Sequence, residues 1–200
     1  LLYAECPQSI LPKQSAIRIL RYLTDEKEGS REALEVGFPI SIEGDIYSLI
    51  HDTVSTVIKI VESTNVVGEE KIEAKKYPPV TLHEIITNAV LHRDYSILKD
   101  IQIRIFTNRI EIESPGILPG HITLENILSE QFSRNPKLVR LISKFPSPPN
   151  KDVGEGLNTA FAAMLKMHLQ KPQIVETANS VIVIIKHERL ADAETLVMQY

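Results

Sequence analysis

The stretch TLHEIITNAVLHRDY, residues 81–95, decides the fold of this chain. Its apolar residues recur every three or four positions, which predicts a helix over residues 81–91. Glu84, Asn88 and His92 are four residues apart and share another face of that helix. A carboxylate, an amide and an imidazole in one row can serve as a base, a metal ligand and a phosphate contact.

The same helix also has a purely structural interpretation. Thr81 and Glu84 have the spacing of a capping box, in which the glutamate side chain bonds back to the Thr81 amide. His92 is equally compatible with an ordinary surface or hydrogen-bonded histidine, and Arg93 with Asp94 with an ion pair at the helix end. Spacing alone leaves both interpretations open.

On the N-terminal side of this helix, the hydrophobic period changes along the chain. A period of two predicts a strand at 16–22, and a helical period predicts a helix at 45–63 with Asp45 as its N-cap. A turn is expected at 65–68 and an exposed strand at 69–77. Residues 1–44 as a whole are expected to stand apart from the main layer, as the end of a separate unit.

On the C-terminal side, the expected elements are strands and short helices separated by loops. They are strands at 100–106 and 110–114 joined as a hairpin, helices near 124–128, at 136–144 and at 157–169, and strands at 173–177 and 181–187. A loop that could act as a lid is expected at 146–149, and a last helix over the final dozen residues. Helices gathered against such strands predict an α+β fold, a two-layer sandwich with a mostly antiparallel sheet covered by helices.

Composition limits the classes of protein. The 200 residues carry a net charge of −4, which argues against a basic surface dedicated to nucleic acid. The single cysteine, Cys6, cannot form an internal disulfide, and no apolar run approaches the roughly 20 residues of a membrane span. A cytoplasmic protein without a membrane partner is expected. The chain begins with Leu1, so we expect a piece of a longer protein.

Two glycine-containing segments are further candidates for a ligand site. Residues 113–120 follow a predicted strand, and Gly116 there allows the backbone to approach a flat ligand. Gly154 and Gly156 precede a predicted helix, whose free amides can bind phosphate. Each segment alone is more often a simple turn.

Together with the 81–95 helix, these segments resemble the GHKL ATPases, the group of gyrase B, the histidine kinases and MutL, whose domain is the Bergerat fold. The resemblance is closer to a branch found in RecG-related helicases and transcriptional regulators. It rests on NAxxHRDY at 88–95, SPG at 114–116, RNP at 134–136 and GxG at 154–156, and it covers about residues 78–187.

The resemblance implies ATP and Mg²⁺ as cofactors and a role for each matching residue. Glu84 would polarise the attacking water, and Asn88 would bind Mg²⁺. The glycines of the two boxes match Gly116, Gly154 and Gly156, and His92 would contact phosphate. Ser114 stands where the family has an aspartate that accepts a hydrogen bond from adenine. This sequence therefore departs from the family at the residue that would recognise the adenine.

A row of cations follows these motifs. Arg134, Lys137, Arg140 and Lys144 recur at three and four residues along one predicted helix face. Such a row is usually solvated, and the sharper alternative is a lid cation that reaches phosphate.

The resemblance also implies a domain organisation. Residues 1–44 would be the C-terminal remnant of an AlbA-like domain, shared with Schlafen proteins, and a linker. Residues 45–190 would be the ATP-binding domain, and 191–200 would begin a linker to a missing C-terminal winged helix. The expected function is a nucleotide-binding regulatory domain of a transcriptional regulator with weak ATP hydrolysis. The alternative is a degenerate scaffold for dimerisation or for coupling flanking domains. DNA would bind only through the absent domains, and a homo-oligomer is left open.

Overall fold

A computed structural model describes residues 7–9, 15–63, 65–67, 72–74, 76–149 and 156–187. Its helices, after a short 3-10 turn at Pro7–Ser9, are α1 (Ile46–Glu62), α2 (Pro79–His92), α3 (Pro136–Ile142) and α4 (Gly156–Lys166). Its strands are β1 (Ile17–Arg21), β2 (Ile40–Ile42), β3 (Asn65–Val67), β4 (Ile72–Ala74), β5 (Ile101–Ile105), β6 (Arg109–Pro115), β7 (Gln173–Glu176) and β8 (Ser180–Lys186).

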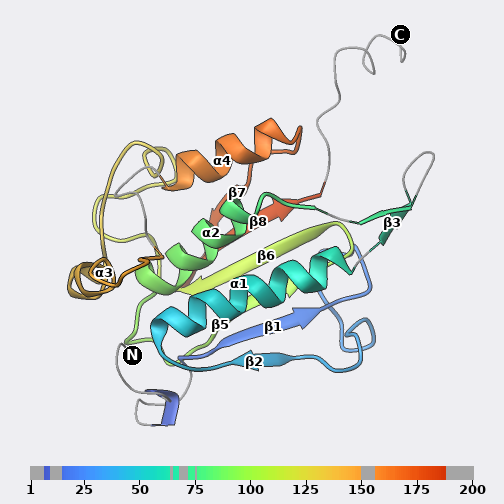
Figure 1. The fold of residues 1–200 in the computed structure, drawn as a ribbon, viewed down its shortest axis with the longest axis horizontal. Helices are drawn as coiled ribbons and strands as arrows, with labels where there is room; N and C mark the ends of the chain where they lie inside the picture. Colours follow the sequence, from blue (N-terminus) through green and yellow to red (C-terminus); the bar gives the residue numbers. More distant parts are fainter. Residues whose placement is uncertain are drawn as a thin grey trace.

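Six strands form one open sheet, in the order β2-β1-β5-β6-β8-β7. Every neighbouring pair is antiparallel except β1 with β5. Helices α1, α2 and α4 lie in a layer over one face of this sheet, with α2 in contact with both of the others (Figure 1). The structure confirms the predicted α+β fold with two layers and a mostly antiparallel sheet. In the described part of the chain, no helix has the length and hydropathy of a membrane span.

Alternation along the strands explains which face the helices cover. In β5, Ile101, Ile103 and Ile105 are buried, whereas Gln102 and Arg104 between them are only partly buried. The isoleucines face the apolar sides of α1 and α2 and form the core with them. The polar side chains point to the opposite face of the sheet, as a period of two requires.

The N-terminal strands belong to this sheet. β1 pairs in parallel with β5, in a register that sets Ile17 beside Ile101 and Ile19 beside Ile103. Ile17 and Ile19 are 0% exposed and lie in the common core. The expectation that residues 1–44 stand apart from the layer is therefore wrong for β1 and β2. An AlbA-like origin of this segment stays a prediction.

Two smaller expectations are also wrong. Residues 65–67 are not a turn but the strand β3, which pairs with β4 in a separate two-stranded sheet. The short helix expected near 124–128 is a series of turns. There the Ile127 amide donates to the Thr123 carbonyl and the Glu130 amide to the Asn126 carbonyl, but these two bonds are isolated and do not continue into a helix. The helix expected over the last dozen residues lies outside the described residues.

If β1 is part of the domain core, Ile19→Ala will lower the free energy of unfolding of the whole domain. We expect a loss of about 2–5 kcal/mol, because the substitution leaves a cavity in a fully buried site. Arg18→Ala is the matched control: the Arg18 side chain is 51% exposed, so we expect a loss below about 1 kcal/mol. Urea unfolding followed by circular dichroism measures both, and equal small effects would contradict a shared core.

Candidate functional site

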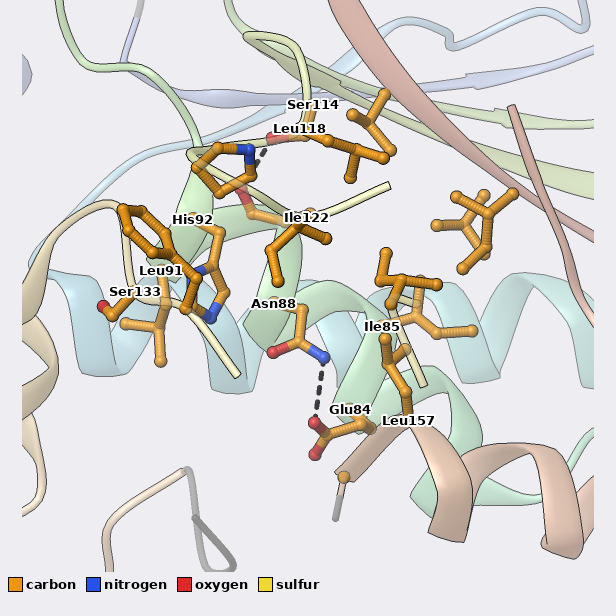
Figure 2. A pocket seen from close by; sticks show the side chains of 18 of the residues that line it. Glu84, Ile85, Asn88, Leu91, His92, Ser114, Leu118, Ile122, Ser133 and Leu157 are labelled. Atoms are coloured by element: carbon orange, nitrogen blue, oxygen red, sulfur yellow. Dashed lines mark hydrogen bonds between the residues drawn. The ribbon is translucent and has the colours of Figure 1, made fainter. Parts of the chain in front are cut away.

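A cavity of about 380 Å³ lies between α2, the end of β6 and the segment that follows β6 (Figure 2). Its volume falls within the range of small-molecule sites. Most of its lining is apolar: Ile85, Ala89, Leu91, Ile112, Ile117, Leu118, Pro119, Ile122, Ile127, Leu128, Phe132, Val139, Leu157, Ile174, Val181 and Val183. An apolar cavity with a few converging polar groups is typical of a ligand site.

The cavity brings together most of the residues that the sequence singled out. The predicted residues that line it are Glu84, Asn88, His92, Ser114, Gly116 and Gly156. They come from four parts of the chain, namely α2, β6, the turn after β6 and the start of α4. Gly154 lies outside the described residues. The chemical roles expected for these residues stay predictions.

Helix α2 carries Glu84, Asn88 and His92 in one row, which we call the polar row. Burial of the opposite side of the helix holds this row in place. The helix begins at Pro79, two residues before Thr81, and Thr81 Oγ1 donates to the carbonyl of Ala160 in α4 at 2.9 Å. The capping-box interpretation is wrong, because Thr81 lies inside the helix and its amide donates to the carbonyl of Pro78 at 2.9 Å. Glu84 is left to face the cavity.

Glu84 and Asn88 form a bonded pair along α2. Asn88 Nδ2 donates to Glu84 Oε1 at 2.9 Å, as the dashed line in Figure 2 shows. This bond orients the amide, so that Asn88 Oδ1 lies on the side away from Glu84. The pair thus presents a carboxylate and an amide oxygen to the same space.

Gly156, the first residue of α4, lies against the Glu84 side of this pair. A Cβ at Gly156 would collide with the Glu84 carboxylate. Because Gly156 has no side chain, the N-terminal end of α4 can lie directly against the Glu84 carboxylate. Any larger residue would push the Glu84 side chain out of its position.

Ser114 lies on the helix-facing side of β6. Its hydroxyl donates to the carbonyl of Ala89 in α2 at 2.8 Å, which fixes the direction of the proton. The oxygen keeps lone pairs that can accept a hydrogen bond from a ligand. The neighbouring Glu113 points to the opposite face, as the alternation along a strand requires.

Glu113 cannot replace Ser114 as an acceptor in the cavity. It bonds to Lys99 at 2.6 Å and to Arg104 at 2.7 Å on the far face of the sheet. Burial alone would raise the pKa of this carboxyl, but the bonds from Lys99 and Arg104 lower it below its usual value. Glu113 is therefore a charged carboxylate in an ion-pair network with Lys99 and Arg104, and it is not part of the site.

Gly116 makes the turn that ends β6. Its φ of +105° is a left-handed conformation that favours glycine, and a Cβ there would lie 2.8 Å from Cβ of Asp94. The Asp94 amide donates to the Pro115 carbonyl at 2.8 Å, so the end of α2 and the end of β6 are joined at this point. Close backbone approach is the reason for glycine here.

His92 lines the cavity one turn beyond Asn88. Burial lowers the pKa of its imidazole, and the positive charge of Arg134 lowers it further. The usual pKa of histidine is about 6.5, so His92 is neutral at pH 7. A neutral imidazole offers one donor and one acceptor to a ligand.

Sequence reasoning placed Arg134 in a row of cations, either solvated or with a lid cation that reaches phosphate, and the structure gives Arg134 another place. Its Nε donates to the carbonyl of His92 at 3.1 Å, and Nη1 lies 3.3 Å from Asp94 Oδ2. Asn135 Nδ2 donates to the carbonyls of Leu91 and Arg93, each at 2.9 Å. The two residues thus satisfy the last carbonyls of α2, and the signal that they share in the sequence is the RNP triplet.

The charge of the cavity is unusual for an anion site. Its charged lining residues are the two carboxylates Glu84 and Glu130, and no Lys or Arg stands among the described residues that line it. The rest of the predicted cation row, Lys137, Arg140 and Lys144, is exposed on and just after α3. A polyphosphate would therefore need a cation of its own at this site.

Comparison with known proteins supports a RecG-related ATPase-like domain. Residues 99–185 match the family model described as "Putative ATP-dependent DNA helicase recG C-terminal". The match covers somewhat under half of the chain, and it begins after α2, so Glu84, Asn88 and His92 lie outside it. No curated protein sequence matches the chain.

Solved structures share the fold. One of them is the crystal structure of the DIP2311 protein from Corynebacterium diphtheriae, with a TM-score of 0.69 and 19% identity. The similarity covers 88% of this chain and 29% of that one, so this chain spans less than a third of its length. At this identity the comparison supports the fold alone.

The lowered pKa of His92 predicts a pH-dependent stability. The unfolded state binds the His92 proton more tightly, so this contribution is complete above about pH 6.5 and is lost as the pH falls below it. We expect the free energy of unfolding to fall from pH 7.5 to pH 5 less steeply in His92→Gln than in the unsubstituted protein. Urea unfolding at several pH values measures it, and parallel profiles would contradict the assignment.

Proposed function

We propose that this chain is a nucleotide-binding domain that takes ATP with Mg²⁺, and that it acts as the regulatory domain of a transcriptional regulator with weak ATP hydrolysis. One observation carries the ATP proposal. Glu84 and Asn88, bonded to each other on α2, face the same cavity beside Gly156. The match of residues 99–185 to a RecG-related family supports it.

The donor set around Glu84 and Asn88 fits a magnesium-bound polyphosphate. Asn88 Oδ1 is an uncharged oxygen ligand of the kind that Mg²⁺ prefers. Mg²⁺, when bound, supplies the positive charge that the described walls lack and neutralises phosphate oxygens. Gly156 lets the start of α4 come close to the same space, where its amides would face the phosphates.

The apolar part of the cavity fits a nucleobase. Ile112, Val181 and Val183 from β6 and β8 offer a flat apolar wall beside Ser114. Because the Ala89 carbonyl holds the Ser114 proton, the hydroxyl oxygen would act toward the base as an acceptor. A neutral acceptor binds an exocyclic amino group more weakly than a carboxylate does, so we expect weaker binding than an aspartate would give.

Glu84 is the residue that we propose as the general base. Its carboxylate is held by Asn88 Nδ2 and lies where the start of α4 approaches α2. A carboxylate in hydrogen-bond reach of a water can accept its proton as the water attacks phosphorus.

A second candidate function is a non-catalytic scaffold that dimerises or couples flanking domains. Two observations favour it: the neutral Ser114 at the base position, and exposed apolar side chains near the cavity mouth. Ile117 is 50% exposed and Phe132 is 43% exposed. Exposed apolar groups that cluster on one surface can mark a protein interface. On either function, DNA contact and transcriptional control would belong to other domains of a longer protein.

The ATP proposal predicts that Asn88→Ala weakens binding of Mg-ATP about tenfold or more, because a metal ligand and the bond to Glu84 are lost together. Isothermal titration with Mg-ATP, and with ATP in excess EDTA, measures it. Asn108→Ala is the matched control, since Asn108 lies in the β5–β6 hairpin away from the cavity. No binding by the unsubstituted protein at millimolar Mg-ATP would overturn the proposal in favour of the scaffold.

The hydrolysis proposal predicts different effects of Glu84→Gln on turnover and on binding. The glutamine keeps an oxygen that can accept from Asn88, but it cannot take a proton. We expect phosphate release to fall about a hundredfold, with the Kd for Mg-ATP within about threefold of the original. Single-turnover phosphate release and titration calorimetry measure the two quantities. Unchanged turnover in the variant would assign any hydrolysis to another group.

A further inference from the structure

The segment that forms the outer wall of the cavity, residues 117–133, contains no helix or strand. Ten of its residues line the cavity, among them Ile117, Leu118 and Leu128. We call it the wall segment. With no strand pairing to hold it, polar ties to the body of the domain contribute to its position together with its apolar packing.

Among the described residues, three polar ties join the wall segment to other parts of the domain. The Leu118 amide donates to Glu176 Oε1 of β7 at 2.6 Å, and Asn158 Nδ2 of α4 donates to the Leu128 carbonyl at 3.0 Å. The third tie is the Arg134 guanidinium, whose Nη2 donates to the carbonyl of Ile117. Arg134 follows the last residue of the segment, so this bond joins its two ends.

The same guanidinium also holds the end of α2. Its Nε bonds to the His92 carbonyl and its Nη1 to the Asp94 carboxylate, while its Cζ lies 3.5 Å from the place of a Cβ on Gly116. One planar group thus contacts the helix that carries the polar row, the glycine turn and both ends of the wall. A lysine has one nitrogen and cannot reach these acceptors together.

We propose that Arg134 is a positioning residue for the cavity: it fixes the wall segment against the C-terminal end of α2, so that the wall and the Glu84–Asn88–His92 row are held in one arrangement for a ligand. The proposal rests on the proposed function for the identity of that ligand, Mg-ATP. Ordering a segment without regular secondary structure costs conformational entropy. A tie across its ends reduces the share of that cost that ligand binding must offset.

Asn135 provides the control that separates positioning from stability. It bonds to the carbonyls of Leu91 and Arg93, so Asn135→Ala removes capping of α2 but leaves the bond to Ile117 and the contact with Asp94. Arg140→Met is the control for charge, because Arg140 is exposed on α3 and does not line the cavity. Neither residue contributes to the proposed ligand contacts.

The test measures Kd for Mg-ATP and amide hydrogen exchange of residues 117–133 at a temperature where every variant is fully folded. We expect Arg134→Met and Arg134→Lys to raise Kd about tenfold, and to speed exchange of the wall segment about tenfold. Asn135→Ala and Arg140→Met should leave both quantities within about twofold, although Asn135→Ala should lower the thermal midpoint as Arg134→Met does.

Each outcome decides the proposal. Unchanged Kd and exchange in Arg134→Met, or full rescue by Arg134→Lys, would overturn it. If the unsubstituted protein does not bind Mg-ATP, the proposed function fails. The exchange measurement then still decides whether Arg134 holds the wall segment in place. Faster exchange of the wall segment in the Arg134 variants alone would support it, and equal exchange in all variants would overturn it.

Discussion

The packing of helix α2 is the constraint on which the rest of the structure depends. Its buried side chains, among them Leu82, Ile85 and Ile86, are held by the sheet and by the flanking helices α1 and α4. Because a helix turns 100° per residue, burial of that side also fixes where Glu84, Asn88 and His92 point. The candidate site is thus a consequence of core packing, and its polar row cannot move without disturbing the core.

Two long-range contacts turn this helix into one side of a cavity. At its N-terminal end, Thr81 bonds to α4, so that Gly156 meets Glu84. At its C-terminal end, the carbonyls that a helix leaves unsatisfied are bonded by Arg134 and Asn135, which follow the wall of the cavity. The N-terminal end of α2 therefore positions the region proposed to bind phosphate. The C-terminal end is joined to the outer wall of the cavity.

Most regular elements could be predicted from periodicity, because one face of each is buried. Alternation in β5 and β6, the helical period of α1 and the Asp45 cap are confirmed, with Asp45 bonded to the amides of Tyr47 and Ser48. The placement of β1 could not be predicted. A parallel pair between residues about eighty positions apart leaves no local pattern, so the strand looked like part of a separate unit.

The sequence by itself determined the candidate residues of the polar row and the two glycine turns, because helical spacing and glycine's backbone freedom are local properties. Only the tertiary structure decided three matters: that these residues line one cavity, that Thr81 does not cap α2, and that Arg134 binds helix carbonyls and not solvent. Each of these depends on atoms that are distant in the chain. The spacing of residues in the sequence shows which of them lie on the same face of a helix or strand. The partners of those residues depend on which distant segment folds against that face.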